Sequence, residues 1–187
     1  MAQSRVILKD STMREGLDVP GVVLDAGQKR ELLGRLAAAG IPEVELVAPG
    51  HFASDLQDLR QIGTMDGPVR SSGLIYGYGP AWREQIGMAK GLLDRLDILM
   101  PLADLRPPAG RKEKVLQMRE VLGIALDIHG NAGAGLPHAT QIEQDFVLTV
   151  CGAAVQAGAK RITLYDTNGS ADPWTVATLV QAVRKET

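Results

Sequence analysis

The feature that most constrains this chain is a repeated alternation of short apolar segments with longer amphipathic ones. Each apolar segment has the length and the β-branched content of a buried strand, whereas each amphipathic segment has apolar residues at helical spacing. Strands that alternate with helices are typical of βαβ units, which build a parallel sheet. The pattern therefore predicts a parallel α/β fold.

The boundaries of these segments can be read from apolar runs and capping residues. The expected strands are Val6–Lys9, Glu43–Val47, Ser71–Tyr76, Leu96–Met100, Ile124–Ile128 and Arg161–Tyr165. The expected helices begin near Ala26, Ser54, Pro80, Arg111, Gln141 and Asp172. Successive strands start about 25–40 residues apart, which is close to the average spacing in a (β/α)8 TIM barrel. A doubly wound open sheet is the alternative, but it usually carries a glycine-rich turn after its first strand, and residues 9–13 contain no glycine.

The repeat supplies about six β/α units, whereas a (β/α)8 barrel has eight. We therefore expect residues 1–187 to form one partial TIM-barrel domain from which strands seven and eight are missing. A sheet of this kind has two unpaired edges, which favour association. The missing strands are expected to come from a second copy of the chain, in a homo-oligomer or a swapped arrangement, from a different chain that completes the barrel, or from a further part of the same protein that these 187 residues do not include.

Composition and charge exclude several classes of partner. The net charge of -2 gives no long-range attraction for nucleic acid or for an anionic membrane. No run approaches the ~20 apolar residues that span a bilayer. The single cysteine, Cys151, excludes an internal disulfide and fits a reducing cytoplasm, and its apolar surroundings favour a buried structural thiol. We expect a soluble cytoplasmic protein.

The end of the first expected strand carries the densest cluster of polar residues. Arg14 and Glu15 stand side by side and are followed by Gly16, at the point where the chain leaves the strand. In a TIM barrel the chemistry is found at the carboxyl ends of the strands. A carboxylate there can ligate a hard cation, and a neighbouring guanidinium can hold the oxygen of a carbonyl or an enolate. The alternative is a simple ion pair in a loop.

Three ordered motifs favour the catalytic interpretation. The segment Ile7–Gly16 resembles the opening signature of the DRE-TIM metallolyases, a superfamily that includes isopropylmalate and homocitrate synthases and hydroxymethylglutaryl-CoA lyase. The segment Ala39–Pro49 resembles the second strand of that superfamily, and Ala157–Gly169 resembles its sixth. The resemblance runs from about residue 5 to the end of the chain.

The resemblance implies a role for individual residues. Glu15 is similar to the metal-binding carboxylate, and Arg14 to the residue that polarises a substrate carbonyl and stabilises an enolate. Glu45 matches an acid of the second strand that supports the site. Thr167 matches a threonine that binds a substrate carboxylate, and Arg106 lies where homocitrate synthases place an arginine for the distal carboxylate. A solvated loop arginine is the other interpretation of Arg106.

The same resemblance implies a divalent metal cation, Mg, Mn or Zn, as cofactor. The superfamily completes its metal site with a His-x-His pair, and this sequence contains no such pair. A lone carboxylate does not hold a divalent cation at useful affinity, because hard cations take about six ligands. Of the three histidines, His129 is expected at the carboxyl end of strand five, where it is a candidate proton carrier. His51 and His138 are expected in loops.

Two glycine-rich runs need separate interpretation. The run Gly73–Gly79 has only a broken glycine pattern, and Gly130–Gly135 leads into Leu136 and Pro137 rather than into a helix. A dinucleotide-binding turn needs a strand, a glycine turn and a helix in succession. Both runs are therefore expected to form flexible loops at the top of the barrel, and the second is a candidate lid.

These observations converge on carbon–carbon bond chemistry. The favoured hypothesis is an acyltransferase that condenses acetyl-CoA with a 2-oxo acid, with the metal acting as a Lewis acid. A lyase or aldolase of the same superfamily would run the chemistry in reverse, and Leu17 favours it because the lyases carry leucine at that place. A third hypothesis is a non-catalytic half of a split barrel enzyme, which the absent His-x-His pair motivates.

Overall fold

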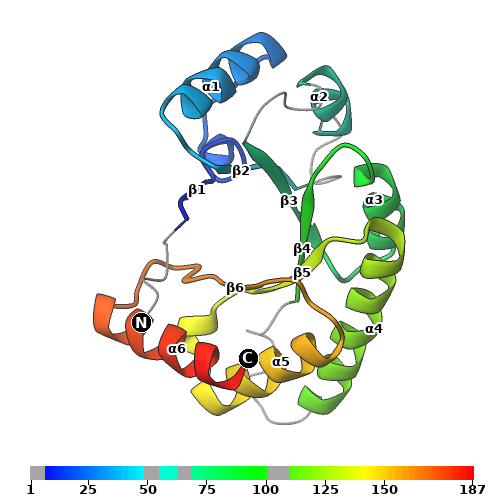
Figure 1. The fold of residues 1–187 in the computed structure, drawn as a ribbon, viewed down its shortest axis with the longest axis vertical. Coiled ribbons are helices and arrows are strands. Elements are labelled where there is room, and N and C mark those ends of the chain that lie inside the picture. Colours follow the sequence, from blue (N-terminus) through cyan, green and yellow to red (C-terminus); the bar gives the residue numbers. More distant parts are fainter. Residues whose placement is uncertain (1–6, 49–54, 63–68, 101–109) are drawn as a thin grey trace. The chain divides into compact units, whose positions relative to one another are not determined.

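The computed structural model describes residues 7–48, 55–62, 69–100 and 110–187. Six strands form one sheet in the order β1-β2-β3-β4-β5-β6, and the helices follow the strands in alternation (Figure 1). A doubly wound sheet reverses its strand order at a switch point, whereas a barrel keeps the order of the sequence. The observed order therefore excludes the open-sheet alternative.

The chain divides into two compact units, which are described separately. The first comprises Met1–Leu74 and Met88–Arg95, and the second comprises Ile75–Gly87 and Leu96–Thr187. In the part of the chain that the structure describes, no helix is long and apolar enough to cross a bilayer.

The first unit contains β1 (Lys9–Asp10), α1 (Ala26–Ala38), β2 (Glu43–Val47) and α2 (Asp55–Ile62), and β3 (Arg70–Tyr76) begins in it. Strand β2 pairs in parallel with both β1 and β3, and all five of its residues are buried. Helix α1 begins with a capping box, in which Asp25 accepts a hydrogen bond from the Gln28 backbone while the Gln28 side chain accepts one from the Asp25 backbone.

The second unit contains most of α3 (Trp82–Ala89) and of β4 (Arg95–Leu99). It also contains α4 (Arg111–His129), β5 (Ala132–Leu136), α5 (Gln144–Gln156), β6 (Ile162–Leu164) and α6 (Pro173–Glu186). The strands β4, β5 and β6 pair in parallel. Helices α4 and α5 pack on β5 and on each other, and α6 packs on α5. Asp172 caps α6 as the sequence predicts, accepting a hydrogen bond of 2.7 Å from the backbone of Thr175.

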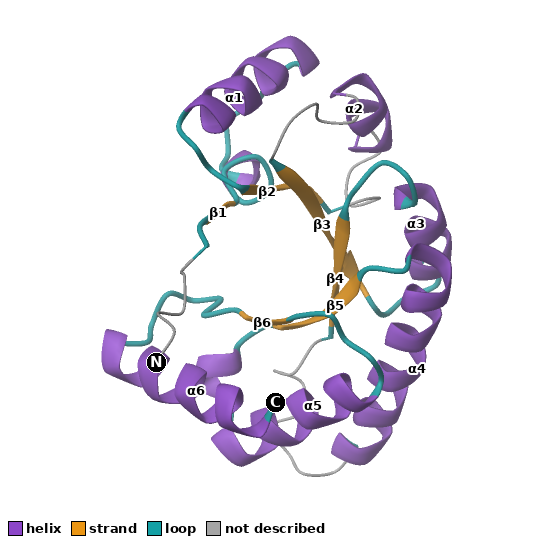
Figure 2. Ribbon diagram, in the orientation of Figure 1, coloured by secondary structure: helices purple, strands orange, loops and turns teal. Residues whose placement is uncertain are grey.

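The predicted fifth strand is wrong. Residues 124–128 belong to the last turns of α4, a helix of 19 residues, and the strand is Ala132–Leu136 (Figure 2). The β-branched residues Ile124 and Ile128 suggested a strand. However, the residues that α4 buries (Met118, Val121, Leu122 and Ala125) continue at helical spacing into this segment, and tertiary packing overrides the local propensity.

The glycine run predicted as a loop forms this strand because two neighbouring strands approach it closely. A Cβ atom at Gly133 would lie 2.7 Å from the Arg161 carbonyl oxygen and 2.9 Å from Asp97 Oδ1. Asp97 is buried, and its Oδ2 atom accepts hydrogen bonds from Arg161 Nη2 at 3.1 Å and from Thr163 Oγ1 at 3.0 Å. Glycine on β5 thus leaves room for the ion pair between Asp97 of β4 and Arg161, the residue before β6.

The remaining differences are at element ends. Strand β1 is Lys9–Asp10 rather than Val6–Lys9, and Ile7 and Leu8 are exposed. Cys151 is fully buried in α5, as the sequence predicts, and burial raises the pKa of its thiol to about 11.

Candidate active site

The turn after β1 sets the position of the Arg14–Glu15 pair. Asp10 accepts hydrogen bonds of 3.0 Å from the backbone N–H and from the hydroxyl of Thr12. The backbone N–H groups of Arg14 and Glu15 then donate to the carbonyl oxygen of Ser11 at 3.1 and 2.8 Å. Aspartate favours such a turn because its short side chain bonds the backbone two residues on. The turn therefore presents both charged side chains at the carboxyl end of β1.

A buried carboxylate on β2 fixes the arginine. Arg14 Nε donates to Glu45 Oε1 at 2.6 Å, and Lys9 Nζ lies 2.5 Å from Glu45 Oε2. The Glu45 side chain is only 3% exposed, so this carboxylate is held between two cations out of contact with water. A guanidinium group that is hydrogen-bonded at one edge keeps its other N–H donors in a fixed orientation. Such donors can bind an oxygen atom of a bound molecule.

Glu15 has a different environment. Its carboxylate forms an ion pair with Arg14 Nη1, and its side chain is 64% exposed, against 15% for Arg14. The cluster of Lys9, Arg14, Glu15 and Glu45 thus contains two cations and two carboxylates. Glu15 is its exposed member, so it is the carboxylate that can leave the arginine at small cost.

The described residues do not make up a divalent-cation site. No group of three or more His, Cys, Asp or Glu side chains within the described ranges could hold a metal ion. The carboxylate predicted as the metal ligand, Glu15, is paired with Arg14. Since hard cations take about six ligands, this donor set alone does not fit the cation.

A second polar cluster lies at the carboxyl ends of β5 and β6, in the second unit. The backbone N–H of His138 donates to Thr167 Oγ1 at 2.9 Å, and His138 Nδ1 lies 3.2 Å from Gln141 Oε1. Gln141 belongs to a 3₁₀ helix, η3 (Ala139–Gln141), and its amide nitrogen donates to Ser170 Oγ at 3.0 Å. The predicted site residue Thr167 is therefore attached to the loop after β5.

Asp166 ties the same two loops together. Thr140 Oγ1 donates to one oxygen of Asp166 at 2.6 Å, and the backbone N–H of Ala171 donates to the other at 3.0 Å. These hydrogen bonds, that of Thr140 first, lower the pKa of the Asp166 carboxyl. The ionised form of Asp166 thus fixes the loop after β6 against η3.

His129 was predicted to lie at the carboxyl end of the fifth strand, and this predicted position is wrong. His129 is the last residue of α4, and Asn131 and β5 follow it. Its ring Nδ1 accepts a hydrogen bond of 3.4 Å from the Asn131 backbone. It therefore lies at the amino end of β5, whereas barrel chemistry takes place at the carboxyl ends. Arg106 and His51 lie outside the described residues.

Two residues of these clusters were not singled out from the sequence as site residues. Lys9 was assigned only to a strand, although its position at the carboxyl end of the expected strand Val6–Lys9 was a signal for it. His138 was assigned to an ordinary loop because strand five was placed too early. Once β5 is Ala132–Leu136, Pro137 and His138 directly follow its carboxyl end.

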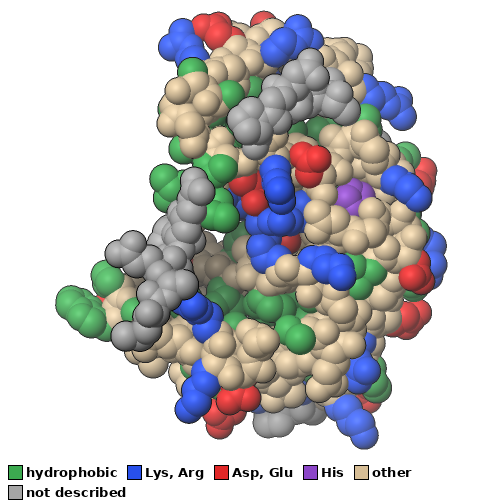
Figure 3. All heavy atoms as spheres, in the orientation of Figure 1, with side chains coloured by type: hydrophobic (Ala, Val, Ile, Leu, Met, Phe, Trp, Pro, Cys, Tyr) green, Lys and Arg blue, Asp and Glu red, His purple; other side chains and the backbone are tan. Residues whose placement is uncertain are grey.

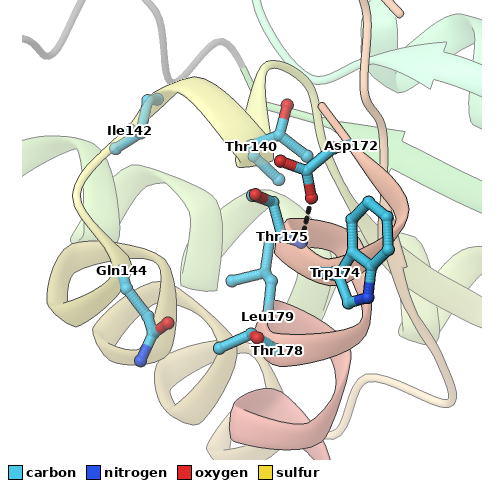
Figure 4. Close-up of a pocket in the computed structure, with 9 residues that line it drawn as sticks. Thr140, Ile142, Gln144, Asp172, Trp174, Thr175, Thr178 and Leu179 are labelled. Carbon is cyan, nitrogen blue, oxygen red and sulfur yellow. Dashed lines mark hydrogen bonds between the residues drawn. The ribbon is translucent and has the colours of Figure 1, made fainter. Parts of the chain in front are cut away.

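A pocket of about 340 Å³ lies beside η3 and the first turns of α5 and α6 (Figure 4). Thr140, Gln144, Asp172 and Trp174 are among its lining residues, and Trp174 is 78% exposed. Asp172 is used as the cap of α6 (the dashed line in Figure 4) and Thr140 bonds Asp166, so both serve the local fold.

The distribution of charged side chains on the surface agrees with the low net charge of the chain. On the face shown in Figure 3, basic and acidic side chains are interspersed. On this face, such a surface offers no extended field of one sign to a polyanion.

Comparison with known proteins decides the family. Residues 5–187 match the HMGL-like family. The chain belongs to this family. Homocitrate synthase of Saccharolobus islandicus (strain M.14.25 / Kamchatka #1) is 27% identical over 189 residues, which is 97% of this chain and 41% of that protein. The HMGL-like chain thus spans less than half the length of this curated relative.

Solved structures confirm the fold of this HMGL-like chain. The HMG-CoA lyase from Brucella melitensis superposes with a TM-score of 0.75 at 19% identity, covering 97% of this chain and 68% of that one. The carboxyl transferase domain of Rhizobium etli pyruvate carboxylase, solved with pyruvate and biocytin, gives 0.76 at 17% identity, over 98% of this chain and 34% of that one. The predicted barrel class is therefore confirmed, with six strands among the residues that the structure describes.

Proposed function

We propose that this chain contributes to an enzyme that forms or breaks a carbon–carbon bond next to the carbonyl of a 2-oxo acid. The proposed direction is the condensation of acetyl-CoA with the 2-oxo acid. The observation that carries the proposal is the Arg14 guanidinium, held by Glu45 at 2.6 Å at the carboxyl end of β1. Support also comes from homocitrate synthases among the relatives and from the R. etli domain, which was solved with pyruvate.

Arg14 has the chemistry that such a reaction needs. Addition to a carbonyl places negative charge on its oxygen, and a fixed donor stabilises that charge without reorganising. Glu45 holds one edge of the guanidinium, and the exposed Glu15 occupies another. A substrate oxygen would displace Glu15, because that carboxylate regains water when it leaves, whereas the buried Glu45 would not.

Thr167 is proposed to bind the substrate carboxylate. Its Oγ1 atom already accepts a hydrogen bond from the His138 backbone, and its side chain is exposed. The hydroxyl proton therefore remains available for an oxygen of the substrate.

The role of Glu15 as a metal ligand stays a separate prediction, because the described residues do not complete a cation site. Mn²⁺ titration in the presence of pyruvate tests it. We expect weak binding that Glu15→Ala removes and that Glu31→Ala, on the exposed face of α1, leaves unchanged. Binding that survives Glu15→Ala would remove Glu15 from the metal site.

Thiol release from acetyl-CoA with pyruvate, 2-oxoisovalerate and 2-oxoglutarate tests the reaction itself. We expect Arg14→Gln to lower the rate by about 10²–10³-fold, the effect of removing one oxyanion donor. Arg35→Gln makes the same change of charge in an exposed pair with Glu31 and is the matched control. Equal rates in the two variants would contradict the role of Arg14.

A lyase that cleaves a C–C bond is the second candidate, favoured by the HMG-CoA lyases among the fold neighbours. The same guanidinium would then stabilise the enolate that cleavage leaves. Release of a carbonyl product from a 3-hydroxyacyl thioester, without thiol release from acetyl-CoA, would favour the lyase. The third possibility, a non-catalytic half that needs a partner, requires that the 187-residue chain alone show neither reaction.

A further inference from the structure

His138 occupies a backbone conformation that a side chain rarely adopts. Its φ and ψ are 56° and 24°, and it is the only non-glycine residue with positive φ within the described ranges. Glycine takes this conformation without steric cost, whereas histidine does not. Strain of this kind is found where the side chain serves a function. The position of the strained residue, two residues beyond β5, is the carboxyl edge of the strands.

Hydrogen bonds fix which nitrogen of the His138 ring carries the proton. Gln141 donates its amide nitrogen to Ser170 Oγ, and its amide oxygen accepts from Asn168 Nδ2 at 3.3 Å. The Gln141 oxygen is therefore an acceptor, so the His138 Nδ1 atom 3.2 Å away must be the donor. In the neutral ring the proton is then on Nδ1, and Nε2 carries a lone pair.

The lone pair on Nε2 is available. The described hydrogen bond of the His138 ring involves its Nδ1 atom, the other described hydrogen bonds of this residue involve its backbone N–H and carbonyl, and the side chain is half-buried. The backbone N–H also orients the Thr167 hydroxyl, so one residue presents a proton acceptor and aligns a proton donor. The two groups suit a molecule that carries a hydroxyl and a carboxylate.

We propose that His138 is a catalytic residue whose Nε2 atom exchanges a proton with the hydroxyl of a hydroxy acid. This inference rests on the proposed function. In the cleavage direction Nε2 takes the hydroxyl proton, the oxygen electrons form the carbonyl, the C–C bond breaks, and its electron pair becomes the enolate. In the condensation direction the enolate forms the C–C bond and the imidazolium returns the proton to the alkoxide. Each step conserves atoms and electrons.

Nitrogen-15 NMR of the imidazole rings of the 187-residue chain tests the arrangement directly. Near pH 8.5, where an ordinary imidazole is neutral, we expect the His138 Nδ1–H form, and Gln141→Ala should shift the ring toward the Nε2–H form. Malate, the hydroxy acid probe, should shift the Nε2 resonance of His138 and leave that of His129 unchanged. An Nε2–H tautomer in the wild type, or no response to malate, would overturn the inference.

Variants separate this inference from the proposed function. His138→Asn keeps a residue that tolerates positive φ, so the fold should survive. We expect it to weaken malate binding about tenfold and to lower the catalysed rate by about 10²–10⁴-fold, whereas His129→Asn changes neither. Full turnover by His138→Asn would refute the proton role and leave the proposed function standing. A malate response at His138 without turnover of any 2-oxo acid would refute the proposed function and leave the His138 contact standing.

Discussion

At the scale of single residues, the structure distinguishes carboxylates that look equivalent in the sequence. Glu45 is buried between Lys9 and Arg14, whereas Glu15 is exposed and touches only one edge of the guanidinium. The resemblance placed Glu45 beside the site, but the sequence alone did not predict that Lys9 shares its carboxylate. That contact depends on the register of β1 against β2, in which Lys9 lies opposite Glu43.

The burial of Glu45 predicts a large loss of stability when its charge is removed. Glu45→Gln leaves two cations without their shared carboxylate, so we expect the free energy of unfolding to fall by about 3–5 kcal/mol. Glu31→Gln breaks the exposed Arg35 pair on α1 and should cost about 0.3–0.5 kcal/mol. Urea denaturation of both variants measures the difference, and similar losses would contradict the burial of Glu45.

The hydrogen bond from Thr140 predicts a change in the titration of Asp166. Because it is the largest cause of the lowered pKa, Thr140→Val should raise the pKa of Asp166 toward the ordinary value. Carboxyl carbon-13 NMR measures that pKa. Thr149→Val is the control, since its hydroxyl bonds a backbone carbonyl in α5.

The lowered pKa also fixes the sign of a pH effect. A carboxyl with a lower pKa in the folded state stabilises the fold above its unfolded pKa, and this contribution is lost as the pH falls through the folded pKa. The wild type should therefore lose more stability on acidification than Thr140→Val. The reverse order would mean that the Asp166 bond does not form in solution.

At the scale of elements, most of the fold could be predicted from apolar runs and caps. Strand β2 has the predicted ends, and α6 begins after the predicted cap, because in both segments local preference and packing agree. The prediction of the fifth strand failed because local preference and tertiary packing disagree in that segment. Its sequence is Ala-Gly-Ala-Gly-Leu, a composition with low strand propensity, and the reason for it is contact with β4 and β6.

The space around each glycine predicts opposite effects on stability for two glycine-to-alanine substitutions. Gly133→Ala would place Cβ 2.7 Å from a backbone oxygen, so the variant should be destabilised or fail to fold. Gly123→Ala lies in α4 with no atom within 4 Å of the new Cβ, so it should gain about 0.5–1 kcal/mol. Thermal unfolding of both variants measures these effects. A Gly133→Ala variant as stable as the wild type would contradict the assignment of β5.

At the scale of the whole molecule, the chain has the family and the fold predicted from its sequence, but it is shorter than the known proteins that it matches. The chain belongs to the HMGL-like family and shares the fold of larger proteins, of which it covers 34–68%. Membership of this family could be inferred from the three motifs, because each stands at a strand end where the fold fixes the residue type. The substrate could not be inferred, because Arg106, the residue predicted to select it, lies outside the described residues.

The strand order predicts association. Within the described residues β1 pairs only with β2 and β6 only with β5, and Ile7 and Leu8 beside β1 are 66% and 64% exposed. Unpaired strand edges bind other strands. We expect light scattering after gel filtration to give a native mass of two or more chains of 20.0 kDa each. A stable monomer at a concentration of roughly 100 μM, well above the Kd range of specific interfaces, would contradict this.

In the proposed function, Arg14 is held by Glu45 and binds the oxygen of a 2-oxo acid. Titration calorimetry of pyruvate into the wild type, Arg14→Gln and Arg35→Gln tests it most directly. We expect Arg14→Gln to weaken binding at least about tenfold, since a bond to a charged donor contributes about 1.5–3 kcal/mol, and Arg35→Gln to bind like the wild type. Equal affinity of all three proteins for pyruvate would contradict it.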